Sequence, residues 1–201
     1  MLRRIGKKIN EVGFFNFVKG LIRNNYYKKL QKEYCFDSWH ESPYEWRKYA
    51  QTVCNYINEK KAGTVVDMGC GLGEVIRNSK ANKRIGYDPS KEAIEAAKVL
   101  DRSKTIDYKI GSFGEFVEEG EVDYFITLGF MHGCEEEVWR SAYHRVSNRC
   151  CIHNFIVDVL PKDGKCHQLD FTKILPENYS IKERIGPFLG RRYIEIYEKK
   201  R

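Results

Sequence analysis

The chain has 201 residues, of which 42% are hydrophobic and 13% aromatic, a composition typical of one folded globular domain and not of a disordered chain. It contains no run of ~18–20 apolar residues, which argues against a membrane-spanning helix, and its N-terminus lacks the apolar block of a secretory signal. The formal net charge is +7, and it is concentrated at the N-terminus.

The first 32 residues carry nine lysines and arginines, and Glu11 is their only acidic residue. The excess of eight positive charges leaves the remainder of the chain nearly neutral. A basic segment of this kind can face nucleic acid, an anionic membrane surface or an acidic substrate. A solvated helix face is the alternative.

The cysteines are odd in number and dispersed. Seven of them stand at positions 35, 54, 70, 134, 150, 151 and 166, and no C-x-x-C motif occurs. This pattern predicts reduced thiols in a cytoplasmic protein and no disulfide framework. No histidine pair has i, i+4 spacing either, so no metal site is expected.

Two helices are predicted before residue 60. Residues 14–34 place hydrophobic side chains at helical spacing, which predicts an amphipathic helix packed on the main body by Phe14, Phe17, Leu21 and Ile22. A loop through Pro43 leads to a second helix with one hydrophobic side, formed by Tyr49, Val53, Tyr56 and Ile57. We expect residues 1–60 to form a basic helical arm or lid, and residues 61–201 to form the main domain.

From residue 64 onward, strand and helix patterns alternate. Strands are predicted at residues 64–69, 84–88, 105–111, 122–129 and 150–157, and helices at 74–80, 89–100 and 135–146. Two further strands, 179–186 and 191–199, are separated by the short link 187–190 and read as an antiparallel hairpin. The pattern predicts an α/β fold: a Rossmann-like, mostly parallel sheet with a C-terminal antiparallel hairpin, flanked by helices.

A glycine-rich turn follows the first predicted strand in the stretch DMGCGLGEV. Gly69, Gly71 and Gly73 allow a sharp turn and close approach of a ligand at the carboxyl end of the strand, where open parallel sheets bind ligands. The following helix offers unpaired N–H groups to negative charge. Glu74 occupies the position of the last glycine in the dinucleotide fingerprint G-x-G-x-x-G. An NAD-type oxidoreductase is therefore disfavoured.

An acidic residue, Asp88, ends the second predicted strand in the stretch GYDPS. A carboxylate at this place suits the two hydroxyls of a ribose, which donate hydrogen bonds to it. The alternative is that Asp88 caps the helix that follows.

Three stretches, VVDMGCGLGE, GYDPS and DYFITLGFMHGCEEEVW, together resemble the class I S-adenosylmethionine-dependent methyltransferases, small-molecule branch, and the resemblance covers residues 64–201. It implies S-adenosylmethionine as the cofactor, with the methionine part held by Asp67 and the three glycines and the ribose held by Asp88. It also implies further contacts with the cofactor: the Ser112 hydroxyl and the Phe113 backbone would contact the adenine, and Leu128 and Gly129 would line the cofactor from below. For Leu128, packing in the core is the alternative.

Methyl transfer to a hydroxyl needs a base that ionises near neutral pH, and histidine meets this need. His132, just past the fourth predicted strand, is the first candidate, with a role in shaping the loop or contacting the cofactor as the alternative. His40 is the second, because the N-terminal arm of the family commonly folds over the cofactor. Trp39, Tyr44 and Tyr49 would be residues of the lid, with simple packing as the alternative. Among the other histidines, His153 is a remote candidate for the base, and His144 and His167 are expected to be structural or exposed.

The absence of several motifs limits the class of molecule that can be the methyl acceptor. The sequence lacks the D/N-P-P-Y/F turn of amino-methylating enzymes, a Pro-Cys nucleophile and the paired glutamates of arginine methyltransferases; Glu135, Glu136 and Glu137 suit the first turn of a helix instead. What remains is O-methylation of a small molecule.

The arm stretch KKLQKEYCFDSWHESPY is similar to small methyltransferases of bacterial surface-polysaccharide synthesis, which implies a sugar, nucleotide-sugar or polysaccharide-precursor acceptor. Two alternatives are an RNA or other nucleic-acid methyltransferase, favoured by the basic arm, and a non-catalytic cofactor-binding partner protein. The oligomeric state is not indicated.

Overall fold

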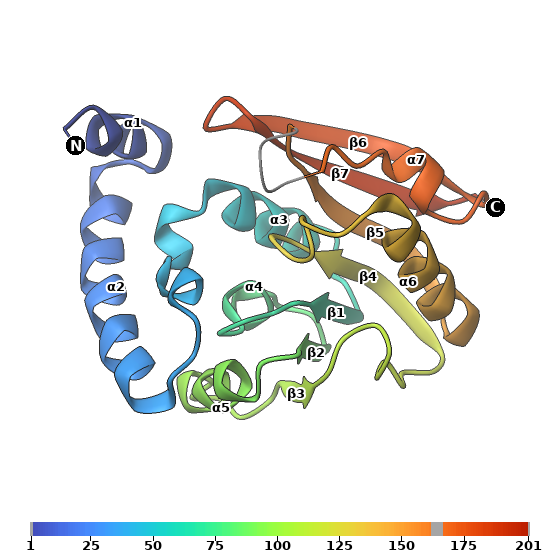
Figure 1. Cartoon of the computed structure of the whole chain (residues 1–201), viewed down its shortest axis with the longest axis horizontal. Helices are drawn as coiled ribbons and strands as arrows, with labels where there is room; N and C mark the ends of the chain where they lie inside the picture. The colour runs from blue at the N-terminus through green and yellow to red at the C-terminus, as the bar shows by residue number, and fades with distance from the viewer. Residues whose placement is uncertain (1, 162–166, 201) are drawn as a thin grey trace.

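A seven-stranded sheet forms the centre of the computed structural model, which describes residues 2–161 and 167–200 (Figure 1). The strand order is β3-β2-β1-β4-β5-β7-β6; β1 to β5 are parallel, and β7 runs antiparallel to both β5 and β6. The strands are β1 Thr64–Met68, β2 Lys83–Asp88, β3 Asp107–Ile110, β4 Glu121–Thr127, β5 Cys151–Val159, β6 Tyr179–Phe188 and β7 Arg192–Lys199. The predicted mostly parallel sheet with a closing hairpin is thus confirmed.

Helices cover both faces of the sheet. They are α1 Leu2–Val12, α2 Phe14–Tyr34, α3 Lys48–Glu59, α4 Glu74–Asn78, α5 Lys91–Leu100, α6 Glu136–Arg149 and α7 Phe171–Ile174, with short 3-10 turns η1 Ser38–Glu41 and η2 Tyr44–Trp46. Buried residues of α3, α4 and α5 share one hydrophobic cluster with the sheet, and those of α6 and α7 share the other. Among the described residues, no helix has both the length and the apolar character needed to cross a membrane.

The central strands are buried on both faces, as expected for parallel strands between two helical layers. In β4, the run from Tyr124 to Thr127 is buried throughout. The edge strand β6 is instead mostly exposed and carries Lys182, Glu183 and Arg184, charges that discourage pairing with other chains. Its position explains one difference from the predicted bounds: β6 continues through Pro187, because an edge strand tolerates a residue without an N–H.

The helices differ from the predicted pattern at two places. No helix was predicted between β3 and β4, and that segment contains only turns, but the short helix α7 before the hairpin was not predicted. The N-terminal segment contains an additional helix, α1, which the sequence did not indicate. The predicted second helix is present as α3, where Val53 and Ile57 are buried as expected while Tyr49 and Tyr56 are half-buried at the margin.

The predicted packing face of α2 is wrong for three of its four residues: Phe14, Leu21 and Ile22 are 62%, 44% and 70% exposed. Phe17 does pack on the body, with its ring stacked on that of Trp46. The buried residues of this helix are Gly20, Tyr27 and Leu30. A Cβ at Gly20 would lie 2.0 Å from the indole nitrogen of Trp46, so glycine admits the Trp46 ring against the helix. Because hydrophobic residues occupy both faces of α2, periodicity could not identify the face that is buried.

Candidate active site

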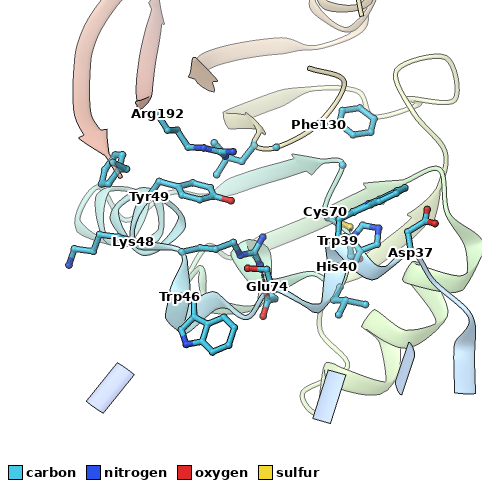
Figure 2. Close-up of a pocket in the computed structure, with 18 of the residues that line it drawn as sticks. Asp37, Trp39, His40, Trp46, Lys48, Tyr49, Cys70, Glu74, Phe130 and Arg192 are labelled. Atoms are coloured by element: carbon cyan, nitrogen blue, oxygen red, sulfur yellow. Dashed lines mark hydrogen bonds and ion pairs between the residues drawn. The ribbon is translucent and has the colours of Figure 1, made fainter. Parts of the chain in front are cut away.

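A cavity of about 620 Å³ opens at the carboxyl ends of the parallel strands, within the size range of small-molecule sites. Its floor is the glycine turn after β1 and the segment after β4. Its walls come from the segment between α2 and α3, from α1 and from the turn between β6 and β7 (Figures 1 and 2). Segments far apart in the sequence therefore enclose one space.

The glycine turn has the backbone conformation that its sequence predicts. Gly69, Gly71 and Gly73 have φ angles of 79°, 53° and 71°, in the left-handed region that favours glycine. A Cβ would lie 2.4 Å from the Phe130 ring at Gly69 and 2.5 Å from His40 Nδ1 at Gly71. Conformation and close packing both require glycine here.

Asp88 lines the cavity beside this turn and is 4% exposed. Its Oδ2 accepts a hydrogen bond from the Gly71 N–H at 2.8 Å, and its Oδ1 accepts one from the Ser90 N–H at 2.9 Å. The cap of α5 is Ser90, whose hydroxyl accepts from the Ala93 N–H at 3.0 Å. Asp88 is therefore not the helix cap, and its carboxylate has lone pairs left for ligand hydroxyls.

Asp67 lies within β1, is 2% exposed, and is not among the residues that line the cavity. Burial raises the pKa of its carboxyl group from the ordinary 3.8 to about 7, Arg47 opposes this shift, and Asp88 adds to it. The structure therefore places Asp67 beneath the turn, where its protonation state affects stability.

We expect Asp67→Asn to flatten the dependence of stability on pH between about 4 and 7. In this window Asp67 keeps its proton in the folded wild type but has released it in the unfolded chain. The free energy of unfolding therefore falls as the pH rises from about 4 to 7, by about 4 kcal/mol at most for a pKa raised from 3.8 to about 7. Urea unfolding at pH 5 and pH 8 measures the effect. An unchanged wild-type slope in the variant would contradict the assignment.

Glu74 connects the N-terminal arm to the glycine turn. This carboxylate, at the start of α4, is 3% exposed and accepts hydrogen bonds from the Tyr27 hydroxyl at 2.7 Å and the Tyr44 N–H at 2.9 Å. It also forms an ion pair with Arg47. The predicted lid residue Tyr44 thus acts here through its backbone. The sequence identified Glu74 only as a departure from the dinucleotide fingerprint, because its partners are 27 to 47 residues away.

The other predicted lid residues lie at the cavity. Trp39 is 70% exposed. The neighbouring residue His40, the second candidate base, lies directly over Gly71. Burial lowers the pKa of His40, although Asp88 and Asp37 oppose this shift. Figure 2 shows Tyr49 beneath Arg192, whose guanidinium lies 4.2 Å from the centre of the tyrosine ring.

His132 belongs to a polar network at the ends of β4 and β5. Its Nε2 lies 3.1 Å from Asp158 Oδ2, and Asp158 also accepts a hydrogen bond from the Gly129 N–H at 3.0 Å and pairs with Arg192. Burial alone would raise the pKa of Asp158, but Arg192 and His132 outweigh it and lower the pKa overall. His132 itself is not among the residues that line the cavity, although it follows the lining residues Phe130 and Met131 in the chain.

Asp158 and Arg192 were missed by sequence reasoning. One signal for Asp158 was present: it is the only acidic residue in the strand CIHNFIVDV, where a buried charge requires a partner. Arg192 gave no such signal, since it lies among other basic residues at the hairpin turn.

The remaining predicted residues divide between the cavity and other regions. Leu128 and Gly129 line the cavity, whereas Ser112 and Phe113 are not among its lining residues. The Ser112 N–H donates to Glu115 at 2.8 Å, and Phe113 is packed in an aromatic cluster with Phe125 and Trp139. The other histidines lie elsewhere: His144 and His167 are exposed, and His153 pairs with Glu121 at the opposite end of the sheet.

Within the described residues, no group of three histidine, cysteine or acidic side chains is placed to hold a metal ion. The six described cysteines are free thiols, and Cys166 lies outside the described residues.

The sequence matches no protein-family model and no curated protein, but the structure is similar to many solved structures. Magnesium protoporphyrin IX methyltransferase (ChlM) from Synechocystis PCC 6803, with bound S-adenosylhomocysteine, has a TM-score of 0.66 and 14% identity; the match covers 90% of this chain and 100% of that one. N-methyltransferase NodS from Bradyrhizobium japonicum WM9, with the same ligand, has a TM-score of 0.68 and 15% identity, and the match covers 87% of this chain and 98% of that one. An S-adenosylmethionine-dependent methyltransferase from Clostridium acetobutylicum ATCC 824 has a TM-score of 0.61 and 12% identity, and the match covers 77% of this chain and 92% of that one.

These likenesses cover most of the chain at low sequence identity, and they define the architecture. The chain has the fold of the class I S-adenosylmethionine-dependent methyltransferases. The cavity lies at the carboxyl ends of its parallel strands, where open α/β sheets bind their ligands.

Proposed function

We propose that the protein is an S-adenosylmethionine-dependent methyltransferase that methylates a hydroxyl group of a small molecule. The observation that carries this proposal is the glycine turn: three left-handed glycines and the buried carboxylate of Asp88 meet at one cavity. The methyltransferase fold supports the proposal, because two of the solved structures that share it contain bound S-adenosylhomocysteine.

The residues present fit this cofactor. Gly69, Gly71 and Gly73 add no side chains of their own to the turn, and Asp88 has lone pairs for the ribose hydroxyls. Phe130 and His40 lie against Gly69 and Gly71 and would have to make room for the methionine part. Leu128 and Gly129 would contact the cofactor from the end of β4. Ser112 and Phe113 remain proposed adenine contacts. When bound, the cofactor supplies an activated methyl group, so the protein mainly aligns the acceptor and excludes water.

The pair of His132 and Asp158 supplies the acid–base chemistry in this proposal. If the His132 Nε2–H donates to the Asp158 carboxylate, then Nδ1 is unprotonated and can accept the proton of an acceptor hydroxyl. Asp158 is held by the Gly129 N–H and by Arg192, so it fixes the orientation of the imidazole ring. His40, over the glycine turn, is better placed to contact the cofactor than the acceptor.

The charges that line the cavity are nearly balanced: five basic residues stand against four acidic ones, which are Glu11, Asp37, Glu74 and Asp88. The small excess of basic groups is compatible with an anionic acceptor, such as a nucleotide-sugar or another phosphorylated precursor of a surface polysaccharide. The fold does not choose the acceptor, since its relatives include a porphyrin methyltransferase and an N-methyltransferase.

Calorimetric titration of S-adenosylmethionine and S-adenosylhomocysteine into the wild-type protein tests the proposal directly. We expect a Kd on the order of 1–100 μM and no binding of NAD. Absence of binding for both sulfur compounds would refute the cofactor assignment. Binding without methylation of any nucleotide-sugar or glycan acceptor would instead support a non-catalytic cofactor-binding protein.

We expect Asp88→Ala to weaken S-adenosylhomocysteine binding by roughly 10²–10³-fold, because two charge-assisted hydrogen bonds to the ribose would be lost. Calorimetry measures the change, and Asp107→Ala, an exposed acid on β3, is the matched control. Because Asp88 also accepts the Gly71 N–H, thermal melting must show that the variant is folded. A folded Asp88→Ala protein with wild-type affinity would exclude the ribose contact.

A further inference from the structure

Helix α2 has a second hydrophobic face, which points away from the body of the protein. The side chains at positions 15, 18, 22 and 26 recur at helical spacing on one side. This outer face of α2 comprises Phe14, Phe15, Val18, Leu21, Ile22 and Tyr26, which are 62%, 80%, 37%, 44%, 70% and 45% exposed. Figure 1 shows α2 along one margin of the molecule, with the sheet on its other side.

The concentration of exposed hydrophobic residues on this helix is unusual. Of the thirteen large hydrophobic residues exposed in the described chain, six lie on α2, and the others are scattered over several elements. Single exposed hydrophobic side chains are ordinary, but a contiguous patch marks an interaction site. The opposite face of α2 already packs on the body through Tyr27 and Leu30.

The charges around the outer face identify the partner that it fits. Helix α2 carries five basic residues and a single acid, Glu33, near its end. Exposed lysines border the face at positions 19, 28, 29 and 32, with Lys7 exposed on α1. A second copy of this chain would bring these cations together, whereas anionic lipid headgroups would neutralise them. Aromatic and aliphatic side chains flanked by lysines are the composition of helices that lie in the membrane interface.

We propose that the outer face of α2 docks the protein on an anionic lipid bilayer, with the helix parallel to the membrane plane. The exposed side chains enter the boundary between headgroups and acyl chains, and the lysines contact lipid phosphates. Helix α2 is fixed to the glycine turn through the Tyr27–Glu74 hydrogen bond. Docking therefore holds the cavity at a defined distance from the bilayer.

Sedimentation with vesicles tests this proposal without any methylation assay. We expect the wild-type chain to bind phosphatidylcholine vesicles that contain about one third phosphatidylglycerol, more weakly at high salt and least to pure phosphatidylcholine. Phe15→Ser/Ile22→Ser should reduce the partition coefficient at least ~10-fold. Val99→Ser/Val138→Ser is the matched control, since those residues are 52% and 50% exposed on other helices, and it should bind as the wild type does.

Each other outcome overturns the proposal. If the wild-type protein does not bind anionic vesicles at low salt, a lipid bilayer is excluded as the partner. If Phe15→Ser/Ile22→Ser binds vesicles with unchanged affinity, the outer face of α2 is excluded as the docking surface. A wild-type dimer that the same variant converts to a monomer identifies a second copy as the occupant. Tight, salt-dependent RNA binding without vesicle binding identifies nucleic acid instead. Because Phe15 and Ile22 are exposed, circular dichroism should show unchanged folding.

Discussion

Replacement of His132 by alanine is expected to lower kcat by roughly 10²–10⁴-fold, the usual contribution of a general base, while S-adenosylhomocysteine affinity stays within about threefold of the wild type. The imidazole contacts Asp158, His132 directly follows the lining residue Met131 in the chain, and in the proposed mechanism the imidazole receives the proton of the acceptor hydroxyl. Turnover is measured with labelled S-adenosylmethionine and the best acceptor from a nucleotide-sugar screen, and affinity is measured by calorimetry.

Three further variants separate catalysis from simple structural support. His144→Ala, an exposed histidine on α6, should retain wild-type kcat. Asp158→Asn should lower kcat and alter the pH–rate profile, because an amide cannot hold the imidazole as a carboxylate does. His40→Ala should weaken cofactor binding more than it lowers kcat, since His40 packs over Gly71. If His40→Ala lost kcat while His132→Ala retained it, the roles assigned to the two histidines would be reversed.

Replacement of Glu74 by alanine is expected to destabilise the fold by about 3–5 kcal/mol, the cost of leaving one partner of a buried ion pair without the other. Glu74 is buried and receives hydrogen bonds from Tyr27 and Tyr44 in addition to the charge of Arg47. Removal of the Glu74 carboxylate leaves the half-buried guanidinium of Arg47 without its ion-pair partner and the buried hydroxyl of Tyr27 without its acceptor. Urea unfolding followed by circular dichroism measures the free energy.

The matched control is Glu95→Ala, which removes an exposed ion pair with Lys91 on α5 and should cost less than about 1 kcal/mol. A double-mutant cycle with Arg47→Ala isolates the pair, and the combined variant should lose less than the sum of the single losses. A cost for Glu74→Ala no larger than that of Glu95→Ala would show that the arm is held chiefly by its hydrophobic contacts. Limited proteolysis would then locate any loosening of residues 1–47.

The sequence by itself determined the sheet and the core of the proposed cofactor site. Long apolar runs specify buried parallel strands, and the spacing of Gly69, Gly71 and Gly73 specifies a turn that other residues cannot adopt without strain. Asp88 follows from its place at the end of β2. These features are local: each depends on a strand and the few residues that follow it, so pattern and backbone chemistry suffice to predict them.

Only the tertiary structure decided how distant segments meet. The Glu74 contacts join α2, η2 and α4, and the network of His132, Asp158 and Arg192 joins the ends of three strands. The packed face of α2 likewise depends on which side receives Trp46 against Gly20. Such choices depend on shape and partner atoms remote in sequence, and a hydrophobic pattern with two equivalent faces carries no information about them.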